Sequence, residues 1–342
     1  MDLNKAQTIF KQVPTLVRVS PIGVVTQKGD ASGRKYHRVN LSDGTSLIIM
    51  ELASEVGPVA GGGVTLTQDE TYLLLEDLYR KNNVPCPKII AELKPEKILI
   101  IEDVGDVSLM RCLNEPKAQD VEAALSSFGE DPLSEAFRRS IDLLVKLQAV
   151  SKSDHVAFKR FYGAEEYFAE SFRFITFFAE PNQCASIVKQ KIEQEIRDLC
   201  EKVATHPRTL CHRDYMSWNI HLRSDGSPVI IDFQDTLLGS VAYDLATLLT
   251  DRDADSDLGP ERVGKLFEYG KKVLQLNDTT TMIDEVIAQR NIRLVGQFTR
   301  LSNEKSKHYA AFIPGCLKRS VAVLTRLGIA PTLAQYLKEF SK

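Results

Sequence analysis

Three polar residues between positions 212 and 232 have the types and spacing that phosphoryl transfer needs. Asp214 ends the tripeptide His212-Arg213-Asp214, Asn219 follows after four residues, and Asp232 lies thirteen residues beyond the Asn. This order matches the H-R-D-x-x-x-x-N pattern, followed by a metal-binding Asp, of phosphoryl-transfer enzymes. We therefore predict that Asp214 is the catalytic base for an acceptor hydroxyl and that Asn219 and Asp232 bind Mg²⁺.

Each of these residues also has an ordinary structural explanation. Asp214 could cap a helix and Asn219 could occupy a turn, because both side chains readily hydrogen-bond nearby backbone. These explanations account for the residues singly and leave their joint spacing unexplained. We expect His212 and Arg213 to have scaffolding roles, in which they hold backbone carbonyls near the loop.

A hairpin tip of small residues at 29–33 is a candidate for binding the triphosphate of ATP. Gly29 and Ser32 can offer backbone N–H groups and a hydroxyl to phosphate oxygens. By itself the tip is equally compatible with a solvated turn. The kinase motif downstream is what favours a phosphate-binding role.

The strand lysine that usually contacts the phosphates is absent. Residues 47–50 read Leu-Ile-Ile-Met where that lysine is expected, and the next cation after Arg38 is Arg80. One interpretation is an inactive kinase. We favour relocation of the cation to Arg34 and Lys35, which directly follow the hairpin tip together with Arg38. The acid that normally pairs with the lysine is left unassigned between Glu70 and Glu76.

The elements that must position these residues form two groups. Strand-like runs with turn signals between them predict a small antiparallel sheet at 16–27, 35–41, 46–52 and 97–102, with a helix at 68–82. Helical periodicity predicts helices at 133–150, 165–179, 183–205, 241–250, 260–275, 281–303 and 315–326. The fold class is therefore α+β and bilobal, with a nucleotide-binding lobe at 1–103 and a catalytic, substrate-binding lobe at 104–342.

The segment between the two groups is acidic and contains a glycine, Asp103-Val104-Gly105-Asp106. It is the best candidate for an interlobe hinge, and we expect the adenine to bind at 102–105. Glu102 and Val104 are the candidate contacts.

Composition excludes several classes of function. The 342 residues are 43% hydrophobic with a net charge of −3, which gives no general attraction to nucleic acid. The six cysteines form no Cys-x-x-Cys pair, and neither they nor the six histidines show zinc-ligand spacing. No Gly-x-Ser-x-Gly elbow is present. Without an apolar leader or a run long enough to span a bilayer, we expect a cytoplasmic protein that does not bind membranes.

The chain resembles the aminoglycoside phosphotransferase and choline kinase family, small-molecule kinases with a protein-kinase-like bilobal fold. Within it, the chain looks closest to bacterial kinases of the anomeric hydroxyl of N-acetylmuramate and N-acetylglucosamine. The segments that carry this resemblance are 29–38, 101–106, 231–245 and 293–301, above all Phe233-Gln234-Asp235 after the metal Asp. The resemblance implies an ATP- and Mg²⁺-dependent kinase of an amino sugar, and that subfamily also lacks the strand lysine.

Two departures leave the acceptor open. Trp218 stands where a basic residue is usual, and the stretch 251–257 is unusually acidic. The acidic run could be a solvated surface loop or could favour a cationic acceptor, as in an aminoglycoside or a choline or ethanolamine kinase. Trp218 and Asp235 are candidate substrate contacts, and Asp244 is expected to hold the catalytic loop or cap its helix. A nucleotide-binding pseudokinase is the alternative of another class. Oligomeric state and the choice between ATP and GTP stay open.

Overall fold

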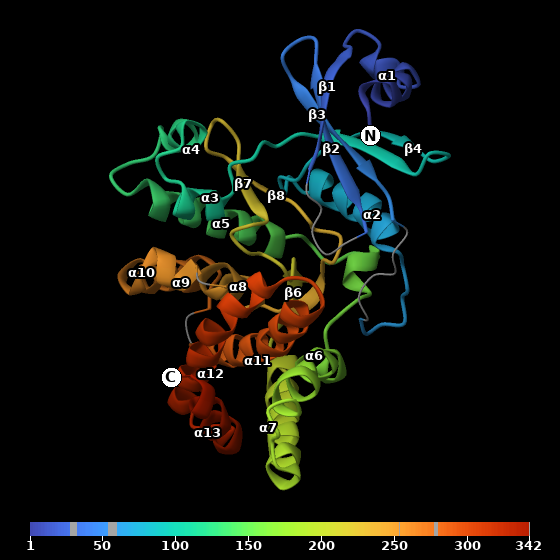
Figure 1. The fold of residues 1–342 in the computed structure, drawn as a ribbon. Coiled ribbons are helices and arrows are strands. Elements are labelled where there is room, and N and C mark those ends of the chain that lie inside the picture. Colours follow the sequence, from blue (N-terminus) through green and yellow to red (C-terminus); the bar gives the residue numbers. More distant parts are fainter. Residues whose placement is uncertain (28–32, 54–59, 253, 277–279, 342) are drawn as a thin grey trace.

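The computed structural model describes residues 1–27, 33–53, 60–252, 254–276 and 280–341. Five antiparallel strands form one sheet in the order β1-β2-β3-β5-β4 (Figure 1). The strands are β1 (Pro21–Thr26), β2 (Lys35–Leu41), β3 (Ser46–Glu51), β4 (Ile89–Leu93) and β5 (Ile98–Glu102).

Helices cover both faces of this sheet, because alternate residues of its central strands are apolar on both sides. Ile49 and Ile100 face the helix α1 (Leu3–Lys11), whose Ile9 and Phe10 belong to the same cluster of buried side chains. Met50, which neighbours Ile49 along β3, joins a second cluster with residues of the helix α2 (Gln68–Lys81). A capping box between Thr67 and Glu70 begins α2, so Glu70 has a local structural role.

The rest of the chain is mainly helical and shares the second cluster, so one core continues from the sheet into the helices. The helices are α3 (Leu109–Asn114), α4 (Gln119–Leu125), α5 (Pro132–Gln148), α6 (Ala164–Ser171), α7 (Ser186–Ala204), α8 (Tyr243–Thr250), α9 (Ala254–Leu258), α10 (Pro260–Val273), α11 (Thr280–Glu304), α12 (Ile313–Leu327) and α13 (Pro331–Phe340). Short strands interrupt them: β6 (Arg208–Cys211), β7 (Ile220–Leu222), β8 (Pro228–Ile230) and β9 (Leu237–Ser240).

The α+β class is therefore confirmed, while several elements differ from the sequence-based prediction. The helix predicted at 165–179 divides into α6 and a π-helical turn at Ile175–Ala179. The first predicted strand begins only at Pro21, because residues Pro14–Leu16 form a 3₁₀ turn. Periodicity did not predict α1, α3, α4, α9, α13 and β4, most of which are shorter than the window in which a helical period is visible.

The sheet and the helical part also meet away from the hinge. Gly61 and Phe161 are joined by backbone hydrogen bonds of 2.8 and 3.3 Å, which attach the loop before α2 to the segment before α6. The division of the chain at residues 103 and 104 stays a prediction. No helix in the described ranges is both long enough and apolar enough to cross a membrane.

Candidate active site

A cavity of about 590 Å³ lies between the sheet and the helical part and is lined by residues of both. Asp214, Asn219 and Asp232, the predicted base and metal ligands, all line it. The structure therefore brings together three residues that the sequence linked only by spacing.

Hydrogen bonds to α8 hold the loop that carries Asp214. Asp244, in the first turn of α8, accepts hydrogen bonds from the backbone nitrogens of His212 (2.6 Å) and Arg213 (3.0 Å). Nε2 of His212 lies 2.9 Å from the carbonyl oxygen of Ile231, which connects the loop to the end of β8. His212 and Asp244 thus have the structural roles expected of them.

Backbone strain occurs at two points of this site. Arg213 (φ 76°) and Asp232 (φ 59°) adopt the left-handed conformation that non-glycine residues seldom use. Each costs on the order of 1–3 kcal/mol, and such residues persist where the surroundings hold them in place. The turn at Arg213 directs the next residue, Asp214, into the cavity, and the turn at Asp232 directs its own side chain into the same cavity.

The electrostatic surroundings of Asp214 keep it ionised. Burial acts to raise the pKa of its carboxyl, but the positive charges of Arg293, Arg213 and Arg290 outweigh burial and hold the pKa below its ordinary value. Asp214 is therefore a carboxylate at neutral pH and can accept a proton.

Asn219 and Asp232 have the chemistry of Mg²⁺ ligands. The amide nitrogen of Asn219 donates to the carbonyl oxygen of Asp214 (2.9 Å), so its amide oxygen is the atom available to a metal ion. Asp232 is exposed to the cavity, and Nε2 of Gln234 donates to its Oδ1 (2.7 Å). Among the described residues no group of three or more His, Cys, Asp or Glu could hold a metal. Two oxygen ligands suit Mg²⁺, which takes its other ligands from water and phosphate.

Part of the hinge end of the cavity is apolar, as an adenine ring requires. Ile48 and Ile101 line it from the sheet, Ile231 from the helical part, and Val104 from the hinge. Glu102 also lines the cavity, but its carboxylate accepts hydrogen bonds from Arg223 (2.8 Å) and from the backbone nitrogen of Lys88 (3.2 Å). The Glu102 side chain therefore ties the hinge to the segment 220–228.

The three predicted phosphate cations have different surroundings. Arg34 is buried behind the cavity and does not itself line it. Its Nε lies 3.2 Å from Oδ1 of Asp69 in α2, and its guanidinium lies 5.7 Å from the centre of the ring of Tyr72, which does line the cavity. Lys35 is exposed and does not line the cavity, because alternation along β2 turns it to the other face. Gly29 and Ser32 lie outside the described residues.

Arg38, the third of these cations, points into the cavity at the hinge. Its guanidinium bonds to both oxygens of Asp103 (2.6 and 3.0 Å) and to Asp106, while Ser46 also donates to Asp103 (2.6 Å). Arg38 therefore connects the sheet to both acids of the hinge, and its charge is already used by them.

The opposite end of the cavity is formed by one face of α11. Residues at helical spacing along this face all line the cavity: Arg290, Arg293, Leu294, Gln297, Phe298 and Leu301. Residues 293–301 belong to the segments that carry the family resemblance, but Arg290 and Arg293 were not predicted as site residues. Their spacing of three, continued by the other members of the set, is the signal that could have identified this face.

The two candidate substrate contacts differ in position. Asp235 lines the cavity, 3.7 Å from Nη1 of Arg213; burial raises the pKa of its carboxyl and outweighs Arg213. Trp218 is 43% exposed and does not line the cavity; its ring lies 5.7 Å from the guanidinium of Arg252.

The acidic run at 251–257 is a surface loop only in part. Asp251 is 2% exposed, and its Oδ1 lies 2.7 Å from Nη1 of Arg290. Asp255 pairs with Arg319 at 2.7 Å, whereas Asp257 is exposed. The interpretation of the whole run as solvated is wrong, because buried Arg290 of α11 and partly buried Arg319 of α12 pair with two of its acids. Those pairs also remove the negative charge that would attract a cationic acceptor.

Comparisons with known proteins agree with this geometry. The sequence model described as "Phosphotransferase enzyme family" matches residues 67–276. An N-acetylmuramate/N-acetylglucosamine kinase of Neisseria meningitidis is 26% identical over 225 residues, which are 65% of this chain and 59% of that protein, less than two thirds of its length. The enzyme of the same name from Pseudomonas aeruginosa is 26% identical over 321 residues, or 86% of this chain and 82% of that protein.

Solved structures show the same fold at low sequence identity. The choline kinase LicA from Streptococcus pneumoniae superposes with a TM-score of 0.59 at 14% identity, covering 95% of this chain and 99% of that chain. A spectinomycin phosphotransferase bound to AMP gives a TM-score of 0.60 at 12% identity, covering 98% of each chain. These similarities establish the bilobal kinase-like architecture.

Proposed function

Because the chain belongs to the phosphotransferase enzyme family, we propose that it is a small-molecule kinase that transfers the γ-phosphoryl group of ATP to a hydroxyl of an amino sugar. The observation that carries this proposal is the single cavity lined by Asp214, Asn219 and Asp232. The use of ATP as the donor supports the proposed cytoplasmic location.

The roles of the site residues follow from their positions. Asp214 orients the acceptor hydroxyl and takes its proton as the oxygen attacks the γ-phosphorus. Asn219 and Asp232 would hold Mg²⁺, which when bound neutralises charge on the β- and γ-phosphates. Gln234 fixes the orientation of the Asp232 carboxylate.

For the nucleotide, we assign the role of the missing lysine to Arg34. It pairs with Asp69 of α2, as the strand lysine of protein kinases pairs with a helix glutamate. The Tyr72 ring below its guanidinium packs 4.6 Å from the Phe233 ring, next to Asp232. Gly29 and Ser32 remain candidate phosphate contacts, and Val104 and the backbone of Glu102 candidate adenine contacts. Lys35 is left out of this set.

For the acceptor, an amino sugar is supported by the names of the relatives and by the pairing of Asp251 and Asp255 with arginines. Aminoglycoside and choline or ethanolamine kinases remain the alternative acceptor class. A pseudokinase is disfavoured, because the base and both metal ligands line one cavity.

The test is an ADP-release assay with Mg²⁺-ATP against N-acetylmuramate, N-acetylglucosamine, choline, ethanolamine and kanamycin. Turnover confined to the N-acetyl sugars would support the proposal, with Asp214→Asn as the inactive control. Turnover of a cationic acceptor alone would replace the amino sugar by that class. Nucleotide binding with silence across the panel would favour a pseudokinase.

A further inference from the structure

We propose that Arg290 and Arg293 of α11 bind an anionic group of the acceptor, so that the enzyme prefers an amino sugar that bears a carboxylate to a neutral one. This inference rests on the proposed function and adds the charge of the substrate to it. N-acetylmuramate is such a sugar, and N-acetylglucosamine is its neutral counterpart.

The first argument is the balance of charge around the acceptor end. Each of two carboxylates is shared by two guanidinium groups. Glu170 contacts Nη2 of Arg213 (3.1 Å) and Nε of Arg293 (2.9 Å). Asp251 contacts Nη1 of Arg290 (2.7 Å) and lies 3.7 Å from Nε of Arg252. Neither acid therefore neutralises both of its arginines.

Adding the other charged groups of this region leaves a positive excess. Asp232 is set aside because it is assigned to Mg²⁺. Six arginines then face five carboxylates: Arg160, Arg173, Arg213, Arg252, Arg290 and Arg293 against Asp214, Glu170, Asp235, Asp244 and Asp251. Burial of an uncompensated charge is costly, so an anionic ligand at this position gains from supplying the missing charge.

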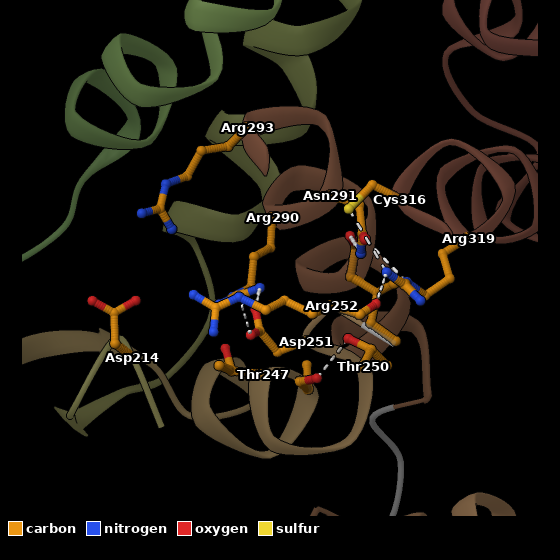
Figure 2. A network of polar contacts seen from close by, with 12 residues as sticks. Asp214, Thr247, Thr250, Asp251, Arg252, Arg290, Asn291, Arg293, Cys316 and Arg319 are labelled. Atoms are coloured by element: carbon orange, nitrogen blue, oxygen red, sulfur yellow. Dashed lines mark hydrogen bonds and ion pairs between the residues drawn. The ribbon is translucent and has the colours of Figure 1, made fainter. Parts of the chain in front are cut away.

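The second argument is direction. Arg290 and Arg293 are one helical turn apart, and both line the cavity that holds Asp214. Figure 2 shows the guanidinium group of Arg293 extending from α11 toward the side on which Asp214 lies and the side chain of Arg290 extending to Asp251, whereas Arg319 points into the packing between the helices. An acceptor whose hydroxyl meets Asp214 therefore presents its neighbouring substituents to this pair.

The third argument is rigidity. The side chains of Arg290 and Arg293 are only 2% and 11% exposed, and each is fixed by an acid behind it. A fixed guanidinium can bind a carboxylate through two parallel hydrogen bonds with little loss of side-chain freedom. The same geometry disfavours a quaternary or primary ammonium, which would meet like charge.

The experiment compares kcat/KM for N-acetylmuramate with that for its carboxamide derivative, which has nearly the same shape and no charge. The wild-type enzyme should prefer the acid by about tenfold to 100-fold, the range that a charge-assisted hydrogen bond contributes. Arg293→Gln should reduce this ratio to near one, and Arg293→Lys should restore part of it. Arg319→Gln is the matched control: it removes an ion pair of the same network outside the cavity, and the ratio should keep its wild-type value.

Equal losses on both sugars in Arg293→Gln would overturn the inference, since they would assign the arginine to the phosphates or to folding. So would a wild-type preference for the carboxamide. Calorimetric titration with N-acetylmuramate separates this inference from the proposed function. Binding that depends on Arg293, in a protein that phosphorylates no acceptor, would support the anion site while the kinase proposal failed. Turnover of both sugars without preference would do the reverse.

Discussion

At the scale of single residues, the proposed mechanism depends on the carboxylate of Asp214. We expect Asp214→Asn to lower kcat by about 10²–10⁴-fold, the range that a general base contributes, because the amide does not accept the hydroxyl proton. Single-turnover kinetics with the preferred sugar measure this. Affinity for Mg²⁺-ATP should change little, since the proposed metal ligands are retained. Near-normal turnover would remove Asp214 from the role of base.

The lowered pKa of Asp214 sets the pH dependence. The active form is the carboxylate, and it becomes protonated only below the ordinary pKa of 3.8. Asp214 should therefore cause no loss of kcat/KM as the pH falls from about 8 to 5. A pH–rate profile of the wild-type enzyme tests this. Asp235 and Asp244, whose pKa values burial raises (to about 7 for Asp244), provide the controls. A fall in that window that disappears in Asp235→Asn or in Asp244→Asn belongs to that residue, whereas one that persists in both variants contradicts our assignment.

At the scale of elements, the pair between Arg34 and Asp69 joins the start of β2 to α2. We expect Arg34→Met to raise KM for ATP and lower kcat, together by at least about tenfold in kcat/KM, because a charge-assisted contact to phosphate is lost. Lys35→Met is the matched control on the neighbouring residue, which faces away from the cavity. Steady-state kinetics with varied ATP compare the two. Equal losses of kcat/KM in the two variants would contradict a specific role of Arg34 and would indicate that the hairpin as a whole contacts the phosphates.

Two helices show which elements a local sequence pattern can predict and which it cannot. α5 was predicted within two residues at each end, because its apolar stripe is long and Asp131 and Pro132 mark its start. α9 has five residues, too few to display a period. The sequence allowed its acids to be interpreted as part of a solvated run, because their partners, such as Arg319, lie about sixty residues away in the sequence.

At the scale of the whole molecule, the contact between Gly62 and residue 159 helps to place the sheet on the helical part. Gly62 has φ +97°, and a Cβ built there would lie 1.8 Å from the carbonyl oxygen of Lys159. We expect Gly62→Ala to lower the free energy of unfolding by about 2–3 kcal/mol. Gly63→Ala is the control, since it shares a positive φ (+68°) but has nothing within 4 Å of its Cβ. Denaturant titration of both variants checks this; losses of the same size would show that the backbone conformation, and not the contact, is responsible.

The sequence by itself determined which chemistry we propose for this protein. The spacing of Asp214, Asn219 and Asp232 predicted a base and two metal ligands, and the structure places all three residues at one cavity. A short loop and a hairpin turn fix those residues relative to one another locally. It also defined the α+β class, since strand and helix periods depend on neighbours a few positions apart.

Only the tertiary structure decided which charges meet. It divided Arg34, Lys35 and Arg38 among a helix acid, the surface and the hinge, and it placed Arg290 and Arg293 beside Asp214. These pairings join segments up to about eighty residues apart. The residue type of a charged side chain does not show whether that side chain is solvated or buried. The identity of a partner across the core depends on packing between elements, which no local pattern in the sequence records.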